Sequence, residues 1–507
     1  MWFKIFISNM RITSTLILII ACFSNLFGQG LTLFNDSYLH EIHFNSVDTM
    51  TFINTEDYQN VDMIVDGVTT NSVGLKQKGN ISASHGNNKI PFKIKTNKYV
   101  NGQEYDGIRE FTLNNSFQDP SMMREKMNYD LSGEMGLYNL RTAYAKIFLD
   151  NHYWGVYTIV EGKDEMFNHV FGNRSGDAIE SSDFGDLCYE GGNKSNYYNS
   201  TLGDYVYIVD NGSNSTAWSR FITMLDKANN TVTNYVSTVD DYLNIIDFTK
   251  YQALNVYCLN FDSYIGYVGN QLYFYDGDAA LWQVIPWDFN ASFGLWNTLN
   301  YGPSSYPIMP SDIYNGCVAS NINTNTTLEN QYYTTMCELA NTYADSTVLN
   351  EIIDNWKAQI KTAVYLDWRK DFNNSDFDNA TGYGYYSHNG EQVPSMKTFA
   401  QVRDETITAA LQNINFNCAT STNYTLSDNS NFKISPNPTT DKIYLDFDYS
   451  VWNETLNYEI INWNGQIVQS GIVNNRMIDL ENLNNGIFIL KCFDAKKNFV
   501  VREIMVF

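Results

Sequence analysis

Three polar residues in the middle of the chain have the types and spacing of a phosphoryl-transfer site. Asp262 follows an apolar segment, Asn270 comes eight residues later, and Asp288 lies beyond a predicted β-hairpin. In such sites one aspartate accepts the proton of the substrate hydroxyl, while an asparagine and a second aspartate hold Mg²⁺ on the nucleotide phosphates. Asp and Asn are also common turn residues. Turn capping is therefore the structural alternative for both aspartates.

The segment before Asp288 is expected to form a β-hairpin. Residues 271–275 and 281–285 alternate in character and flank an Asp-Gly turn, which is the usual signal for two antiparallel strands. Asp288 then leaves the second strand between two aromatic residues and is followed by small residues that end at Gly294. Its carboxylate is therefore expected at the end of the sheet, facing a cleft.

A second candidate element is a lysine-rich strand, loop and strand. Residues 73–79 and 89–95 are the predicted strands, and the loop between them is rich in Gly, Ser and Asn. Small residues let backbone N–H groups approach phosphate oxygens, and a lysine supplies a point charge. Because side chains alternate along a strand, Lys93 and Lys95 are expected to face away from the core. The segment predicts a phosphate-binding loop.

A helix and a hairpin are expected to position these groups. Asp119 is the predicted N-cap and Pro120 lies in the first turn, before apolar residues that recur at helical spacing, Met123, Met127, Leu131 and Met135. Glu125 on this helix is expected either to reach a strand lysine or to lie in solvent. The following hairpin, residues 141–161, ends at Glu161 in a predicted hinge between two lobes.

The first 28 residues have the pattern of a signal peptide. Basic residues Lys4 and Arg11 precede an apolar run at 16–21 that is too short to span a bilayer. A lipoprotein box at residues 19–22 is the alternative. We expect cleavage near Gly28 and export, with no transmembrane span after removal of the leader.

The composition is that of an acidic globular protein. The chain has 32 Lys+Arg against 56 Asp+Glu, a formal net charge of −24. This charge argues against nucleic-acid binding, and it means that a bound nucleotide needs nearby basic groups or metal ions. Of the seven cysteines, Cys22 lies in the leader, and the remaining six permit disulfides in an oxidising compartment. Cys317 with Cys337 is the predicted pair.

These segments, in this order, resemble the spore-coat protein H (CotH) kinase family over about residues 35–415. The resemblance rests on residues 75–80, 89–95, 119–127, 149–161 and 285–294. Members of this family are secreted, atypical protein kinases. The resemblance therefore implies an α+β fold, with a two-lobed, protein-kinase-like domain over residues 30–418, an N-lobe of about 30–161 and a C-lobe of about 162–418.

The resemblance also implies the cofactors ATP and Mg²⁺ (or Mn²⁺), and Ser/Thr of an extracytoplasmic protein as the substrate. It gives each candidate residue a role: a phosphate loop at Lys78, Gly79 and Asn80; an ATP-contacting lysine at Lys93, with Lys95 as the alternative; a partner for that lysine at Glu125; a cofactor contact at Glu161; the catalytic base at Asp262; and metal ligands at Asn270, Asp288 and Asn290.

Two positions depart from the family pattern. Lys78 stands where the family usually has arginine before the loop glycine. The family motif Trp-Asp-x-Asp ends in Asn290 here, which offers a metal a carbonyl oxygen but no charge, whereas Mg²⁺ prefers charged oxygen ligands. Two functions are therefore open: an active Ser/Thr kinase, or a catalytically weak or inactive kinase-like scaffold that acts as a surface adhesin or a glycan- or protein-binding protein.

The last part of the chain resembles a second family. A Ser/Thr/Asn-rich linker, residues 419–431, precedes a Pro-Asn-Pro segment at 436–438, an Asn-Gly turn at 464–465 and a Gly-Ile-Phe strand at 486–488. These features resemble the type A C-terminal sorting domain of the type IX secretion system of Bacteroidetes-like bacteria. The resemblance implies a small β-sandwich over residues 432–507, recognition by the type IX secretion machinery, and delivery to the medium or the cell surface.

Overall fold

The computed structural model describes most of the chain, namely residues 29–49, 57–79, 81–84, 89–172, 175–212, 214–266, 269, 272–277, 281–297, 299–309, 316–388, 390–418, 425–426, 432–446, 456–462, 467–473, 476–480, 483, 486–494 and 498–506. The chain divides into two compact units, with the boundary between Phe416 and Asn417. The predicted signal peptide lies outside the described residues. Within them, no helix has the length and apolar character needed to cross a bilayer.

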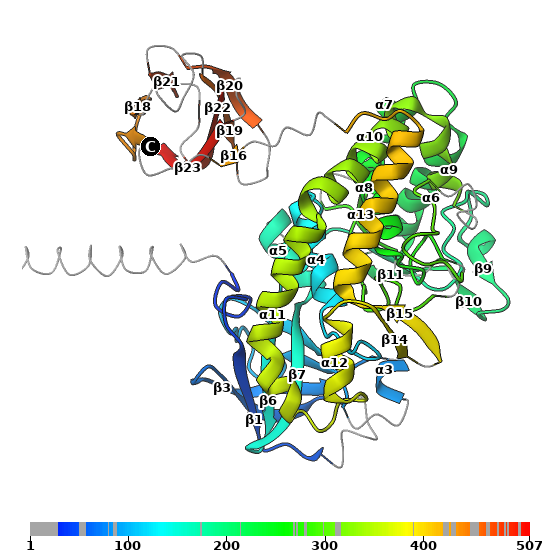
Figure 1. Cartoon of the computed structure of the whole chain (residues 1–507), viewed down its shortest axis with the longest axis vertical. Coiled ribbons are helices and arrows are strands. Elements are labelled where there is room, and N and C mark those ends of the chain that lie inside the picture. Colours follow the sequence, from blue (N-terminus) through cyan, green and yellow to red (C-terminus); the bar gives the residue numbers. More distant parts are fainter. Residues whose placement is uncertain are drawn as a thin grey trace, which may run out of the picture. The chain divides into compact units, whose positions relative to one another are not determined.

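The first unit begins with a closed barrel of seven strands (Figure 1). In barrel order these are β1 (His40–Asn45), β2 (Gln59–Val65), β3 (Val68–Gln77), β4 (Phe92–Lys95), β5 (Glu110–Asn114), β7 (His152–Glu161) and β6 (Thr142–Leu149). Neighbouring strands are antiparallel except β1 and β6, which are parallel. Inward-facing side chains such as Leu75, Phe92 and Leu113 fill the interior. The alternate residues, among them Lys76 and Lys93, therefore lie on the outer face.

The barrel confirms two local predictions. The predicted strand pair at residues 73–95 is β3 and β4, and the predicted hairpin at residues 141–161 is β6 and β7. The barrel closes where β1 pairs with β6, with Ile42 opposite Ile147. The sequence did not predict this closure, and the two-lobed, kinase-like arrangement stays a prediction.

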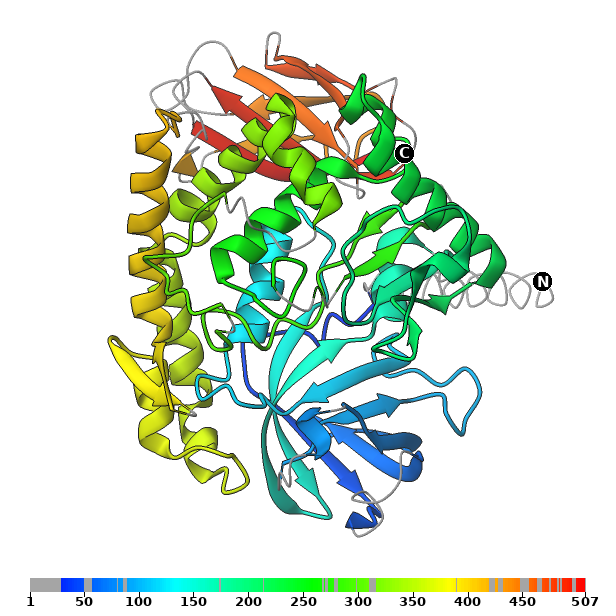
Figure 2. The same cartoon turned by 90° about the vertical axis from the view of Figure 1, so that its right-hand side faces the viewer.

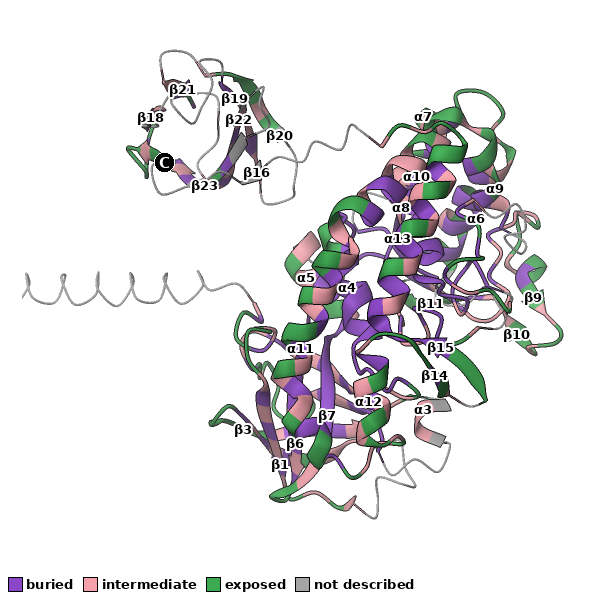
Figure 3. Cartoon of the chain, viewed as in Figure 1, coloured by how far each residue is buried: buried purple, intermediate pink, exposed green. Residues whose placement is uncertain are grey.

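One helix, α4 (Arg124–Glu134), contacts both the barrel and the helical part of the unit. Figure 2 shows it between the two, and Figure 3 shows that most of it is buried. The helix begins at Arg124, later than predicted, because Met122 has a left-handed φ of 58° that interrupts a helical path. Asp119 still caps it: its carboxylate accepts hydrogen bonds from the backbone N–H groups of Met123 and Arg124, both at 3.0 Å.

The rest of the first unit is mostly helical. Its larger elements are α5 (Lys163–Phe171), α6 (Asn214–Asn230), α7 (Tyr235–Val239), α8 (Ile245–Cys258), α9 (Cys317–Thr324), α10 (Thr326–Glu338), η2 (Leu339–Tyr343), α11 (Ser346–Leu366), α12 (Asn374–Ala380) and α13 (Met396–Asn413). The shorter ones are α3 (Ile81–Ser84), η1 (Lys194–Tyr197), the pair β9 (Tyr198–Asn199) and β10 (Asp204–Tyr205), and the pair β14 (Tyr385–His388) and β15 (Glu391–Pro394).

A four-stranded antiparallel sheet lies between α5 and α6. Its order is β11 (Tyr207–Asn211), β8 (Ala178–Ser181), β12 (Tyr273–Tyr275) and β13 (Gln283–Val284). The hairpin predicted before Asp288 is β12 and β13. Phe274 packs on Phe221 of α6, with 5.7 Å between ring centroids, whereas Tyr275 stacks on Phe167 of α5 at 3.8 Å. The two helices therefore cover opposite faces of this sheet.

A disulfide joins Cys188 to Cys317, 129 residues apart. The predicted pairing of Cys317 with Cys337 is therefore wrong. The fold brings the segment before Cys188 to the start of α9, where the backbone N–H of Cys317 donates to the carbonyl of Asp186 at 3.2 Å. Cys337 and Cys418 are also disulfide-bonded, whereas Cys258 and Cys492 are free thiols.

The second unit has only β-strands among its described elements, as the sequence predicted for the C-terminal domain. One sheet contains β16 (Thr425–Leu426), β23 (Asn498–Val506), β22 (Gly486–Asp494), β19 (Leu456–Ile461) and β20 (Ile467–Ile472). The other contains β17 (Lys433–Ser435), β18 (Lys442–Asp446) and β21 (Met477–Asp479). Ile443 and Ile478 of the smaller sheet share one core with Ile460, Leu490 and Ile504 of the larger.

Candidate functional site

The candidate site begins where the outer face of the barrel meets α4. Lys78, directly after β3, donates from Nζ to Oδ1 of Asn114 at 2.8 Å. The Nδ2 of the same amide donates to Oε1 of Glu125 at 2.6 Å. Asn114 thus bridges a lysine of the barrel to a carboxylate of α4 whose side chain is almost fully buried.

The charges at this bridge are not balanced. Burial raises the pKa of Glu125 to about 7, and the negative charge of Asp288 adds to the rise while Lys78 opposes it. Burial also raises the pKa of Asp288, and Lys78 again acts against the rise. Burial lowers the pKa of Lys78, although both carboxylates favour its charged form. Two acids therefore compete for one half-buried lysine, and an additional cation beside them would lower their free energy.

Residues of α4 also hold the loop that carries Asp288. The backbone N–H of Asp288 donates to the hydroxyl of Tyr129 at 3.2 Å, and the Tyr129 ring packs edge-on against Phe289 at 5.5 Å between centroids. Asn128 donates from Nδ2 to the hydroxyl of Ser292. Asp288 has a left-handed φ of 54°, a conformation that Asp tolerates better than most residues. This geometry turns the chain out of β13 and toward α4.

Lys163, the first residue of α5, is a further cation near Asp288 that was not among the predicted site residues. Its Nζ lies 3.1 Å from Oε2 of Glu180 and 3.4 Å from Oδ2 of Asp210. The ring centroids of Tyr273 and Trp287 are 3.8 and 4.4 Å from the same Nζ, which brings this cation next to the residue before Asp288. The positive charge of a lysine is unfavourable in the first turn of a helix, because it opposes the helix dipole. This position was therefore a signal in the sequence that Lys163 has a role other than stabilising the helix.

The predicted pair of Lys93 with Glu125 is wrong. Lys93 instead forms an ion pair with Glu110, 2.6 Å between Nζ and Oε1. The strand register explains the difference, because Lys93 lies opposite Thr112 in the middle of β5. Lys78 lies just beyond the end of β3, where its backbone N–H donates to the carbonyl of Pro91. From this position its side chain reaches Asn114. Lys95 lies at the other end of β4, opposite Glu110.

Glu161, the predicted cofactor contact, is buried at the end of β7. Its Oε1 lies 2.6 Å from Nη2 of Arg141 and 3.1 Å from Nδ1 of His169. Burial alone would raise the pKa of Glu161, but hydrogen bonds from these two residues hold it below its usual value. The carboxylate thus ties β7 to β6 and α5, and its contact with a cofactor stays a prediction.

The remaining candidates lie in loops. Asp262 is half-buried in the turn after α8, and this turn is joined to the Asp288 loop because the N–H of Phe293 donates to the carbonyl of Cys258 at 2.6 Å. Gly79 has a φ of 86°, and a Cβ there would collide with the hydroxyl of Ser82, so the predicted phosphate loop requires glycine. Asn80 and Asn270 lie outside the described residues.

The donor atoms present fit a magnesium nucleotide better than a bare ion. In the described part of the chain, no three His, Cys, Asp or Glu side chains group as a metal site. Mg²⁺ commonly takes one or two carboxylates and completes its shell with phosphate oxygens and water. The carboxylate of Asp288 and the half-buried amide of Asn290 supply oxygen donors of that kind. The raised pKa of Asp288 is consistent with a position that favours a cation.

Comparisons with known proteins cover both units. A family model described as CotH kinase protein matches residues 75–407, and a model described as secretion system C-terminal sorting domain matches residues 433–506. Inner spore coat protein H of Bacillus subtilis (strain 168) is 26% identical over 210 residues, which is 38% of this chain and 51% of that protein. Invasin CotH2 of Rhizopus delemar is 22% identical over 297 residues, 53% of this chain and 47% of that protein. The chain thus spans about half the length of these curated relatives.

Proposed function

Because the chain belongs to the CotH kinase protein family, we propose that it transfers the γ-phosphate of ATP to Ser or Thr hydroxyls of extracytoplasmic proteins. The sorting domain marks it for type IX secretion to the cell surface or the extracellular space. Its acceptors would therefore be proteins outside the cytoplasm.

The observation that carries the proposal is the cluster of Lys78, Glu125 and Asp288. Phosphoryl transfer requires cations at the phosphates and carboxylates that hold the metal, all in fixed positions. The barrel supplies the lysine, α4 supplies one acid, and the loop after β13 supplies the other. Glu125 orients Lys78 through Asn114, so that the ammonium group can bind phosphate oxygens.

Other groups complete the proposed site. Asp288, with Asn290 as a neutral oxygen donor, would hold Mg²⁺ or Mn²⁺, which supplies the charge that neutralises the phosphates. Lys93, close enough to Lys78 to lower its pKa, is a further cation on the same barrel face. Asp262 would accept the proton of the acceptor hydroxyl.

A second candidate function is a catalytically weak or inactive scaffold that binds protein or glycan at the cell surface. Asn290 favours it, because the family motif has an aspartate at this position and the amide brings no charge to a metal. Large exposed aromatic side chains, such as Trp368 (67% exposed) and Tyr383 (64%), could contact such a partner.

Transfer of labelled phosphate separates the two functions. Oxidised mature protein is incubated with γ-labelled ATP, Mg²⁺ or Mn²⁺ and a casein-like acceptor. Asp262→Asn should abolish transfer and keep metal-dependent ATP binding, because only the proton acceptor is lost. Asp288→Asn should lose both, and Asn290→Asp should raise the rate if the missing charge limits it. If neither the wild type nor any of the variants transfers phosphate under these conditions, the kinase proposal is wrong.

A further inference from the structure

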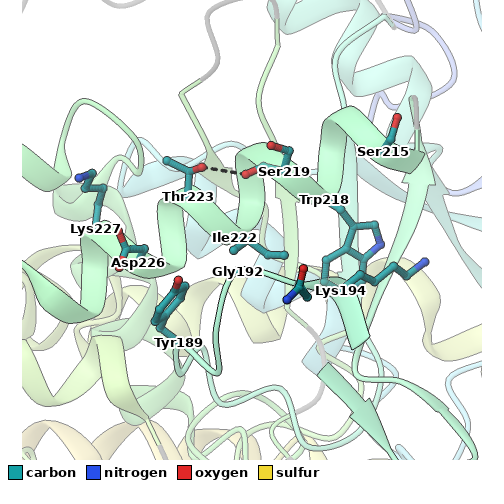
Figure 4. Close-up of a pocket in the computed structure, with 11 residues that line it drawn as sticks. Tyr189, Gly192, Lys194, Ser215, Trp218, Ser219, Ile222, Thr223, Asp226 and Lys227 are labelled. Carbon is teal, nitrogen blue, oxygen red and sulfur yellow. Dashed lines mark hydrogen bonds between the residues drawn. The ribbon is translucent and has the colours of Figure 1, made fainter. Parts of the chain in front are cut away.

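A polar pocket of about 550 Å³ lies along α6, away from the candidate site (Figure 4). One wall is the face of α6 that carries Ser215, Ser219 and Thr223 at intervals of four residues, followed by Lys227. The opposite wall is the loop from Tyr189 to Lys194. We call this feature the α6 pocket.

The four-stranded sheet separates the α6 pocket from the cluster around Lys163. Ile179 of β8 is paired with Phe274, which packs on α6. The next pair, Glu180 and Tyr273, faces the other way, toward Lys163. Because successive residues of a strand point to opposite faces, the pocket and the candidate site lie on opposite sides of one sheet.

The loop wall of the α6 pocket is held in place before any ligand binds. Cys188, beside Tyr189, is bonded to Cys317 of α9. Asn229 of α6 donates to the carbonyl of Leu187 at 2.9 Å. Farther along the loop, the hydroxyl of Tyr197 donates to the carbonyl of Gly191 at 3.2 Å. A preformed wall reduces the entropy lost on binding, as expected for a binding site.

The dimensions of the α6 pocket suit an extended chain. Ser215 and Lys227 are twelve positions apart on α6, which corresponds to about 18 Å along the helix axis. An extended peptide rises about 3.3 Å per residue, so about five residues fit along this wall. The hydroxyls of Ser215, Ser219 and Thr223 and the Asn193 side chain line the same path and can pair with a peptide backbone.

The charge of the α6 pocket indicates the kind of peptide. Figure 4 shows Lys194 and Lys227 toward opposite ends of the pocket, whereas Asp226 is the one acidic side chain among its lining residues. The protein as a whole has a formal net charge of −24, so this pocket is a basic site on an acidic molecule. The positive charge of these two lysines favours an acidic ligand in this pocket.

Neutral glycans fit the α6 pocket less well. Sugars commonly stack on exposed aromatic faces, but Trp218 is only 3% exposed, and Nζ of Lys194 lies 5.1 Å from its ring centroid.

We propose that the α6 pocket binds an acidic, extended peptide segment and thereby docks the protein acceptor of the kinase. The identification of this peptide as part of an acceptor rests on the proposed function, whereas its binding does not. The docked segment and the phosphorylated residue would be separate stretches of the acceptor, because a sheet lies between the two sites.

Fluorescence polarisation tests the binding directly, without ATP. The probes are a labelled six-residue Asp/Glu peptide and its Asn/Gln counterpart. We expect the wild type to bind the acidic peptide more tightly, with affinity falling as salt rises. Lys194→Gln with Lys227→Gln should weaken binding roughly tenfold or more. The matched control, Lys146→Gln with Lys361→Gln, removes the same charge from β6 and α11 and should bind as the wild type does.

The outcomes distinguish this inference from the proposed function. Circular dichroism and the unfolding midpoint should show that both double variants are folded. Ser219→Trp places a large side chain in the α6 pocket from an exposed position of the helix, and this variant should also lose peptide binding. Asp288→Asn should leave peptide affinity unchanged even where transfer is lost. Equal binding of the acidic and neutral peptides, equal losses in the two double variants, or binding of neutral oligosaccharides that the lysine changes abolish would overturn the proposal.

Discussion

The backbone N–H of Asp288 donates a hydrogen bond to the hydroxyl of Tyr129 across 3.2 Å. Tyr129 and Glu125 are four residues apart and therefore on the same face of α4. This one helix thus determines the positions of both acids that compete for Lys78. Any shift of α4 would change the distance of both carboxylates from the barrel together.

Tyr129→Phe should loosen the Asp288 loop without unfolding the protein. The change removes the hydroxyl and keeps the ring against Phe289, so the cost in stability should be about 1 kcal/mol. We expect weaker metal-dependent ATP binding by calorimetry. Tyr138→Phe, in which a partly buried tyrosine outside the site loses its hydroxyl, is the control and should bind as the wild type does. Equal affinities for both variants would show that the hydrogen bond does not position Asp288.

The lysines of the barrel should not contribute equally to nucleotide binding. Lys78 is bridged to Glu125, whereas Lys93 is paired with Glu110 and Lys95 lies farther along β4. Lys78→Gln should therefore weaken ATP binding roughly tenfold or more, Lys93→Gln less, and Lys95→Gln least.

Isothermal calorimetry with Mg²⁺ and ATP gives this ranking. A larger loss of ATP affinity for Lys93→Gln than for Lys78→Gln would show that Lys93 is the main phosphate contact.

Without nucleotide, the stability of the first unit should fall between pH 5 and pH 8. The pKa of Glu125 is raised from 4.5 to about 7 in the folded protein, mainly by burial. The folded state therefore holds this proton more tightly, and the stabilisation is complete below pH 4.5 and lost as pH rises through 7. In Glu125→Gln, the free energy of unfolding should fall by about 3 kcal/mol less over this pH range than it does in the wild type.

Urea unfolding at pH 5 and at pH 8 measures this change in the free energy of unfolding. Glu134→Gln, which changes an exposed residue of the same helix, should show the full wild-type loss. If both variants lose the same stability as the wild type, the proton of Glu125 does not contribute.

Deletion of residues 432–507 should trap the protein in the periplasm. This segment contains the sorting domain, and its strands form a core of their own. The first unit should therefore remain folded and be found by fractionation and immunoblotting inside the cell envelope. Normal amounts of truncated protein in the medium or on the cell surface would contradict the prediction.

The sequence predicted local structure where neighbouring residues determine it. Alternating strands around the Asp276-Gly277 turn gave β12 and β13, and helical spacing gave α4. The start of α4 was misplaced because the strong cap at Asp119 acts across a left-handed Met122, which residue types alone do not reveal. Local signals thus predict the type of an element better than its end.

The contacts of the site depend on long-range register, which the sequence alone did not supply. Lys93 and Lys78 both face outward, and only the pairing of β3, β4 and β5 determines which one reaches Glu125. The closure of the barrel by β1 and β6 has the same origin. Lys163 was missed because the groups around it come from four different segments of the chain.

The disulfide between Cys188 and Cys317 makes the segment between them a covalent ring. Asp262, Asp288 and the α6 wall of the pocket belong to this ring, while Lys78 and Glu125 do not. Outside the cell, where proteases act, a single cut in any loop of the ring would leave both ends attached to the molecule. Fragments of such nicked protein would separate on a gel only after reduction.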